Sequence, residues 1–158
     1  MILVKEQCDP DPDFANTKSP NPEDESAYEL ALEYAKSNDA DIIITTDPDA
    51  DRVGLAVKKN KGQYILISGN QLGAILLRYL LVMKQEKDDL PANPYVVTTT
   101  VTSDLGASIC KKYDIQLDLV HTGFKYIGDR IHWYEKNNPE KTFLFGYEES
   151  YGYLISDN

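Results

Sequence analysis

Apolar residues along this chain follow two spacings, and the spacing changes at clusters of Gly, Pro, Asn and Asp. Short runs rich in Ile, Val and Thr indicate strands, because β-branched side chains suit a pleated surface. Repeats at three and four residues indicate amphipathic helices. The pattern predicts strands over residues 2–4, 42–46, 53–57, 64–67, 95–99, 116–119 and 142–147. It predicts helices from an entry at 20–23 to 37, from an N-cap at 68 through 83, over 103–113 and over 125–137.

Strands that alternate with helices predict the α/β class, here two small, mostly parallel sheets flanked by helices. The turn at 60–62 is the candidate boundary, which gives domains 1–60 and 61–158. The first domain is thin, because a long loop over 9–22 carries four of the eight prolines. Ligands of parallel sheets bind at the carboxyl ends of strands, so we expect the site residues there.

Composition narrows the function classes. The 158 residues are 42% hydrophobic, enough for a packed core. A net charge of −10 argues against nucleic acid as a partner, since such binding relies on Lys and Arg. No run approaches the roughly 20 apolar residues of a membrane span, and the first residues lack a signal-peptide pattern. We therefore expect a cytoplasmic protein without a membrane partner. Cys8 and Cys110 have no spacing that indicates a disulfide framework or a zinc site.

The strongest candidate for chemistry follows the strand over 42–46. Asp47, Asp49 and Asp51 occupy alternate positions, and Arg52 comes directly after them. Three carboxylates at this spacing can converge on one hard divalent cation. The guanidinium offers a planar pair of donors to a phosphate. A metal and a phosphate held side by side suit phosphoryl transfer, in which positioning and charge neutralisation supply most of the catalysis.

Other interpretations of this loop stay open. Asp and Pro are ordinary residues of solvated turns. An EF-hand is excluded, because its sixth and twelfth positions require Gly and Glu but hold Arg52 and Lys58. A phosphatase in which Asp47 attacks phosphorus is conceivable. It leaves the third aspartate and the arginine unexplained. A non-enzymatic module that binds a metal or a sugar phosphate is the other alternative.

Two further loops carry polar groups after predicted strands. The G-Y-E-E-S-Y-G run over 146–152 frames acidic and hydroxyl side chains with glycines, which suits hydrogen bonds to neighbouring sugar hydroxyls. A solvated turn is the alternative. The T-G-F-K run over 122–125 opens a helix, where backbone N–H groups and Lys125 can bind an anion or simply cap the helix. The hydroxyls over 98–104 are interpreted as turn and capping groups.

The order of these runs resembles a known family. T-T-D-P-D-A-D-R-V-G, G-N-Q-L-G, T-T-T-V-T-S-D, H-T-G-F-K-Y-I-G and F-G-Y-E-E-S-Y-G are similar to runs of the α-D-phosphohexomutases, which include phosphoglucomutases and phosphomannomutases. The resemblance covers nearly the whole chain. Family members have four domains around a deep cleft. The resemblance implies an internal fragment, namely the later part of domain II and most of domain III, whose partners are the missing domains I and IV.

The resemblance also implies a reaction. A phosphoserine passes its phosphoryl group to a hexose phosphate, and the resulting bisphosphate, glucose 1,6-bisphosphate for a glucose enzyme, reorients and returns the other phosphoryl group. Mg²⁺ is the implied cofactor, and Arg52 and Lys125 are the implied catalytic residues. The implied metal ligands are Asp47, Asp49 and Asp51, and the implied phosphate contact is Arg52. The sugar hydroxyls would be held by Glu148 and Ser150. The substrate cleft would be lined by Thr122, Gly123 and Lys125.

The chain departs from the family pattern in four respects. Pro48 stands where the common form has Gly. The sugar loop differs from the G-E-M-S-G-H of phosphomannomutase-like members, which favours glucose phosphate and leaves mannose and pentose phosphates open. No T-A-S-H-N-P-like phosphoserine element and no R-x-S-G-T-E-like phosphate loop occurs in the sequence. We therefore expect the chain to have no mutase activity by itself.

Overall fold

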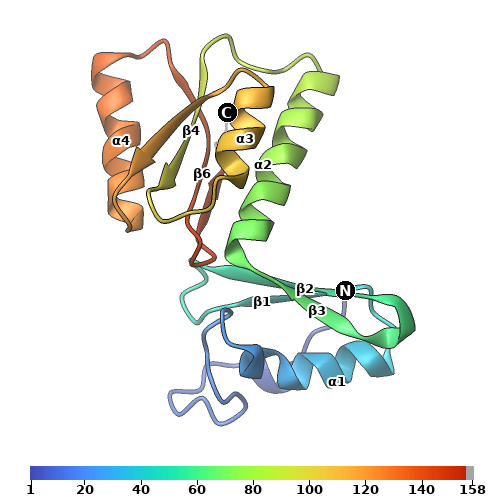
Figure 1. Ribbon diagram of the computed structural model, residues 1–158. Coiled ribbons are helices and arrows are strands. Elements are labelled where there is room, and N and C mark those ends of the chain that lie inside the picture. Colours follow the sequence, from blue (N-terminus) through green and yellow to red (C-terminus); the bar gives the residue numbers. More distant parts are fainter. Residues whose placement is uncertain (156–158) are drawn as a thin grey trace. The chain divides into compact units, whose positions relative to one another are not determined.

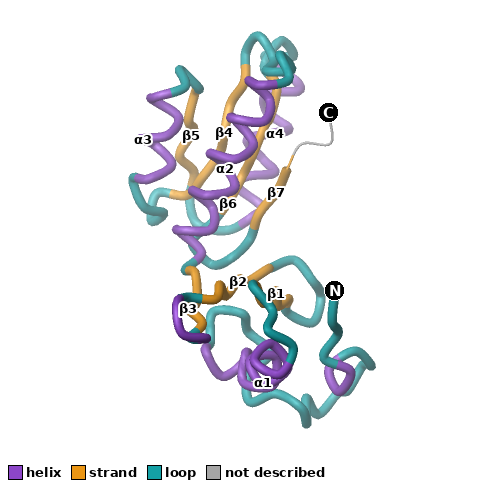
Figure 2. The backbone as a smooth tube through the Cα atoms, turned by 90° about the vertical axis from the view of Figure 1, so that its right-hand side faces the viewer, coloured by secondary structure: helices purple, strands orange, loops and turns teal. Residues whose placement is uncertain are grey.

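The computed structural model describes residues 1–155 and divides into two compact units, Met1–Ser68 and Gly69–Asn158. Figures 1 and 2 show the backbone of each unit. The predicted boundary lay at 60/61, whereas the units divide after Ser68, because the strand over 64–67 pairs with the first unit. No helix in the described part of the chain has the length and apolarity to cross a membrane.

The first unit is a three-stranded sheet with helices on one face. Its elements are η1 (Lys5–Gln7), η2 (Glu25–Tyr28), α1 (Glu29–Ser37), β1 (Ile42–Thr46), β2 (Val53–Lys58), η3 (Asn60–Gly62) and β3 (Tyr64–Ile67). The strand order is β1-β2-β3, so β1 forms an edge. Figure 1 shows α1 lying along this sheet. The buried core between them consists of Tyr28, Ala31, Ala35, Ile43 and Ala56.

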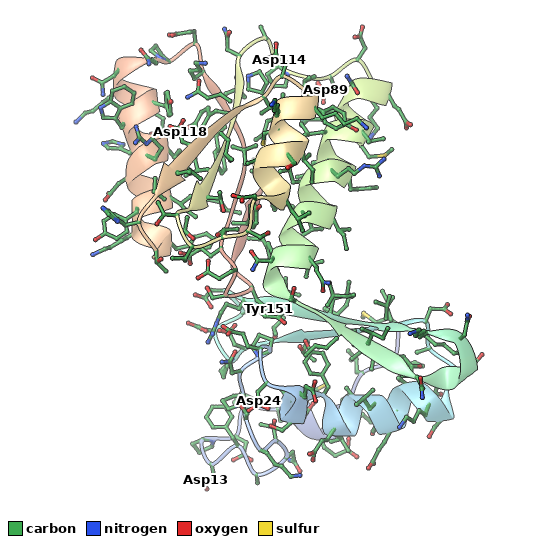
Figure 3. All side chains as sticks on the ribbon, in the orientation of Figure 1. Asp13, Asp24, Asp89, Asp114, Asp118 and Tyr151 are labelled. Carbon is green, nitrogen blue, oxygen red and sulfur yellow. The ribbon has the colours of Figure 1, made fainter. Side chains whose placement is uncertain are left out.

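The segment before α1 is fixed against the sheet by a few close contacts. The Asp24 side chain (Figure 3) caps η2 by accepting a hydrogen bond from the backbone N–H of Ser26 at 2.9 Å. The Tyr28 hydroxyl donates to the carbonyl oxygen of Pro22 at 3.1 Å. A Cβ on Gly54 would lie 2.0 Å from that hydroxyl, so only glycine lets β2 approach so closely. These contacts bring the proline-rich loop next to the β1–β2 hairpin.

Two predictions for the first unit are wrong. Residues 2–4 do not form a strand; Ile2 and Leu3 are more than half exposed, and no ladder partner is present among the described residues. The sheet is antiparallel throughout, not mostly parallel. The reason lies in the connections, because a parallel crossover needs about a dozen residues or more, and the links over 47–52 and 59–63 are too short.

The second unit is a three-layer α/β/α sandwich. Its elements are α2 (Gly69–Glu86), β4 (Pro94–Thr99), α3 (Leu105–Lys112), β5 (Gln116–Val120), α4 (Phe124–Asn137), β6 (Thr142–Tyr147) and β7 (Tyr153–Ile155). The strand order is β5-β4-β6-β7, and only β7 is antiparallel to its neighbour. Helices α2 and α3 lie on one face and α4 on the other (Figure 1). The predicted α/β class with two small sheets and flanking helices is confirmed; β7 was not predicted.

A register shift in β6 sets the direction of the chain at the end of this strand. Pairing with β4 slips between Tyr95 and Val96. As a result, the consecutive residues Leu144 and Phe145 both join the core under α2 and α3. Gly146 then backs onto α4, where its Cβ would lie 2.9 Å from Ile127 Cγ2. The shift therefore fixes which face the last residues of β6 occupy before the chain enters the loop over 148–152.

Candidate active site

The aspartate loop, residues 47–52, closes the β1–β2 hairpin. The backbone N–H of Asp47 donates to the Arg52 carbonyl oxygen at 3.4 Å, and the N–H of Ala50 donates to the Asp47 carbonyl oxygen at 3.1 Å. Ala50 has a φ of 57°, which turns the chain sharply. This turn gathers Asp47, Asp49 and Asp51, whose ligand oxygens lie within 4.8 Å of one another. Asp47 is buried and the other two aspartates are exposed.

Arg52 braces the buried aspartate from two directions. Its backbone N–H donates to Asp47 Oδ1 at 3.1 Å, and its Nε donates to Asp47 Oδ2 at 2.8 Å. Its Nη1 donates to Asn21 Oδ1 at 3.3 Å and lies 3.5 Å from Glu23 Oε1. Within residues 1–155, Nη2 has no hydrogen-bond partner, and a third of the side chain is exposed. The guanidinium is thus fixed at one end and open at the other.

The electrostatics of the loop leave excess negative charge. Burial raises the pKa of Asp47, but hydrogen bonds from Arg52 outweigh burial, and the net shift of this pKa is downward. The pKa of Asp51 is raised by a hydrogen bond shared with Asp47, by slight desolvation and by the charges of Asp47 and Asp49. The carboxylates therefore repel one another, and Arg52 neutralises only part of their charge.

The residues of the aspartate loop fit a divalent cation. All three ligands are carboxylate oxygens, the donor type that Mg²⁺ prefers. Mg²⁺ holds its ligands at about 2.1 Å, so oxygens on opposite sides of the ion lie roughly 4 Å apart. The ligand oxygens of the three aspartates all lie within 4.8 Å of one another, which is close to that value. Asp47 provides the fixed ligand and the other two can adjust.

The sugar loop, residues 148–152, joins β6 to β7. The N–H of Glu148 donates to the Gly152 carbonyl oxygen at 3.0 Å, and the buried Tyr151 (labelled in Figure 3) has a φ of 69°. Glu148 is 6% exposed, and its Oε1 accepts a hydrogen bond from the backbone N–H of Gly123 at 2.6 Å. Gly123 has a φ of 123°, a conformation that side chains rarely allow. The hydrogen bond therefore joins two loops that were predicted separately.

The remaining predicted residues surround this hydrogen bond. Thr122 and Lys125 flank the start of α4 and are exposed, and Ser150 is half-buried. Lys125 Nζ lies 4.7 Å from the centroid of the Tyr126 ring. None of the three side chains makes a hydrogen bond or an ion pair with another part of the described chain. Their polar groups are therefore open to a ligand.

Sequence reasoning missed the residues that support both loops. Asn21 precedes Arg52 by 31 positions and lies in a segment whose prolines indicated only an irregular loop. Thr99 and Thr102 were interpreted as turn and capping residues, but their hydroxyls contact Glu149. The only signal was a concentration of hydroxyl residues at a strand-to-helix turn, and this pattern does not specify a partner in a distant loop.

Comparison with known proteins identifies the family. Residues 1–62 match the family model described as phosphoglucomutase/phosphomannomutase, alpha/beta/alpha domain II, and residues 68–158 match the one described as alpha/beta/alpha domain III. The chain belongs to this family. The resemblance that the sequence motifs carry is thereby confirmed, together with its assignment to the second and third domains.

Curated relatives agree with this assignment. A phosphoglucomutase of Staphylococcus epidermidis is 41% identical over 152 residues, which cover 96% of this chain and 27% of that protein. A phosphomannomutase of Mycoplasmoides pirum is 42% identical over 156 residues, which cover 99% of this chain and 27% of that protein. The chain thus spans about 27% of the length of these relatives, which are mutases.

Solved structures of the family share the fold. A phosphoglucomutase/phosphomannomutase family protein from Burkholderia thailandensis superposes with a TM-score of 0.63 at 17% identity, covering 87% of this chain and 26% of that one. An N-acetylphosphoglucosamine mutase of Aspergillus fumigatus, solved with GlcNAc-6P and magnesium, gives a TM-score of 0.52 at 16% identity, covering 80% and 27%. At this level of identity the likeness concerns the fold.

Proposed function

We propose that this chain supplies the metal-binding and sugar-binding loops of a phosphohexomutase, an enzyme that interconverts hexose 1-phosphates and hexose 6-phosphates. The observation that carries the proposal is the convergence of Asp47, Asp49 and Asp51 beside Arg52 in one hairpin loop. The mutase names of its relatives support the reaction class. In this proposal the part matching domain II carries the aspartate loop, and the part matching domain III carries the sugar loop.

The chemistry of the aspartate loop follows from its charges. When bound, Mg²⁺ would offset the negative charge that builds up on the transferred phosphoryl group. Asp47, Asp49 and Asp51 would hold the cation, and Asp47 keeps its orientation through Arg52. The open Nη2 of Arg52 faces no competing partner within residues 1–155 and would donate to a phosphate oxygen. The phosphoserine donor is proposed to lie outside these 158 residues, since no such motif occurs among them.

The sugar loop would set the orientation of the substrate. Glu148 Oε1 is occupied by Gly123, so Oε2 and the Ser150 hydroxyl would contact neighbouring sugar hydroxyls. Thr122, Gly123 and Lys125 would line the cleft, with Lys125 contacting phosphate. Fixed hydrogen bonds of this kind lower the barrier by orienting the reacting groups. We propose glucose phosphate as the preferred substrate and glucose 1,6-bisphosphate as the intermediate, on the basis of the G-Y-E-E-S-Y-G run.

Titration of the chain with Mg²⁺ tests the metal site. Amide NMR signals of the aspartate loop are expected to shift saturably, and Asp49→Asn or Asp51→Asn is expected to weaken binding at least about tenfold through loss of a charged ligand. Asp13→Asn is the control, because Asp13 (Figure 3) is an exposed carboxylate of the same unit outside the cluster. If all three substitutions weakened Mg²⁺ binding equally, the binding would depend only on the overall negative charge, and the proposed site would be refuted.

Activity assays separate the mutase from the phosphatase. Both oxygens of Asp47 accept hydrogen bonds from Arg52, which makes this carboxylate a poor nucleophile. The purified chain is expected to show no mutase activity. A phosphatase would show activity that is lost in Asp47→Asn, and we expect no such activity. Once joined to the two other family domains, it is expected to convert glucose 1-phosphate, and Glu148→Ala is expected to impair that conversion and leave Mg²⁺ binding intact. Mutase activity of the isolated chain would refute the assignment of the donor to another segment.

A further inference from the structure

Two adjacent acids of the sugar loop, Glu148 and Glu149, have different environments. Glu148 contacts the start of α4 and keeps one carboxylate oxygen without a hydrogen bond to the described residues. Glu149 directs its Oε2 to two hydroxyls of the β4–α3 turn, at 3.0 Å from Thr99 Oγ1 and 3.1 Å from Thr102 Oγ1. The sequence alone gives these acids the same chemistry. The structure separates an acid held by a backbone N–H at the start of α4 from an acid held by two side-chain hydroxyls of the β4–α3 turn.

The hydroxyl protons guarantee a bond to Glu149. Thr99 Oγ1 and Thr102 Oγ1 lie 2.8 Å apart, so three oxygens form a closed triangle with the carboxylate. Each hydroxyl has one proton, and the carboxylate has none when ionised. If one hydroxyl donates to the other, the second still donates to Glu149. Every arrangement that uses both protons inside the triangle therefore gives the carboxylate at least one charge-assisted hydrogen bond.

The backbone next to Glu149 is also confined. A Cβ on Gly69, the first residue of α2, would lie 1.9 Å from the Glu149 carbonyl oxygen. A Cβ on Gly152 would lie 2.4 Å from Phe124 Cε2. Helix starts thus pack directly on both ends of the sugar loop. The Glu149 side chain adds an attachment to Thr99, a fully buried residue at the end of β4.

We propose that Thr99, Thr102 and Glu149 act as positioning residues, here called the latch, that hold Glu148 and Ser150 in place for the hydroxyls of the sugar. The latch acts through the loop backbone and contacts no substrate. This inference rests on the proposed function of the sugar loop. It assigns a role to Thr99 and Thr102 of the T-T-T-V-T-S-D run, which the sequence alone suggested only as turn and capping residues.

The latch is tested without ligand through the amide proton of Gly123. A 2.6 Å bond to a carboxylate shifts this NMR signal downfield, so the signal reports the position of Glu148. Thr102→Val and the double variant Thr99→Val/Thr102→Val remove donors with little change of shape. The double variant is expected to move the signal upfield, and Thr102→Val is expected to move it less, because Thr99 still donates to Glu149. Thr102→Ser keeps the hydroxyl and is expected to retain the wild-type position, and Thr100→Val controls for an exposed threonine in the same turn.

Binding of glucose 6-phosphate supplies the second measurement. The double valine variant is expected to bind about tenfold more weakly than wild type, as is common when the residues that orient a ligand-binding side chain are lost. The separate variant Thr102→Ser is expected to keep wild-type affinity. The latch is refuted if the double variant matches Thr100→Val in both the Gly123 signal and affinity. A wild-type chain that binds no glucose 6-phosphate would contradict the proposed function instead, and the Gly123 signal would still decide the latch. If Thr99→Val prevents folding, Glu149→Met, which removes the carboxylate and leaves both threonines in place, decides.

Discussion

Replacing Arg52 by Met isolates the contribution of its guanidinium to the aspartate loop. Methionine keeps an unbranched apolar stem but cannot donate a hydrogen bond. The Asp47 carboxylate, whose side chain is 2% exposed, then keeps only the backbone N–H of residue 52 as a donor from that position. A hydrogen bond to a charged group contributes about 1.5–3 kcal/mol. Because a third of Arg52 is exposed, water replaces part of this, and we expect a loss of about 2 kcal/mol from the first unit.

The loss has a defined pH dependence in metal-free buffer. The pKa of Asp47 is lowered in the folded chain, despite its burial, by the hydrogen bonds from Arg52. A carboxyl group of this kind stabilises the fold above its unfolded pKa of about 3.9, and the contribution disappears as the pH falls through the folded value. The difference between wild type and Arg52→Met is therefore complete at neutral pH and shrinks below about pH 4.

Hydrogen exchange of β1 and β2 amides in EDTA measures this local free energy. The single tryptophan, Trp133, lies in α4 and reports unfolding of the second unit, which is expected to stay unchanged. Lys58→Met is the matched control, because Lys58 pairs with the exposed Asp39 and ion pairs of this kind contribute little to stability. A loss for Arg52→Met no larger than for Lys58→Met, or one independent of pH down to 3, would refute the reasoning.

Three further predictions concern the second unit and the cysteines. Gly123→Ala is expected to lower the free energy of unfolding in urea by about 1–3 kcal/mol, because the φ of 123° is strained for alanine. The control Gly128→Ala, on open helix surface, is expected to stabilise by up to about 1 kcal/mol. Similar effects of both substitutions would contradict this prediction. Tyr147→Phe is expected to be neutral or stabilising by up to about 1 kcal/mol, because the buried hydroxyl has no partner within the described chain; a loss above 1 kcal/mol would reveal one. At pH 8 a thiol reagent is expected to label only the exposed Cys8 before unfolding, since burial raises the pKa of Cys110 to about 11; equal labelling rates would show that Cys110 is accessible.

Local patterns predicted most elements but not how they pair. The β-branched run over 42–46 forms β1 with the predicted bounds, because its residues favour a strand in any context. Alternation of strands and helices suggested parallel pairing, and the short link over 47–52 was the better indicator of an antiparallel hairpin. The strand β7 has only three residues, and a run of that length gives no periodicity to detect.

The candidate site divides in the same way. Asp47, Asp49 and Asp51 are neighbours in sequence, so one turn was sufficient to bring them together as the spacing suggested. The contact between Gly123 and Glu148 depends on the register of β6 and the entry of α4, which no local pattern encodes. Sequence reasoning therefore identified the candidate ligand-facing groups and missed most of the groups that hold them.

The two hairpin loops share one backbone plan. Each begins with a buried acid, Asp47 or Glu148, whose N–H bonds to the carbonyl of the last loop residue. Each turns through a non-glycine residue at positive φ, Ala50 or Tyr151. The strand pair thus fixes where the first carboxylate stands, and the intervening side chains are free to vary. The same strand pair and loop closure can therefore carry different side chains. Carboxylates in the loop suit a cation, whereas acidic and hydroxyl side chains suit the hydroxyls of a sugar.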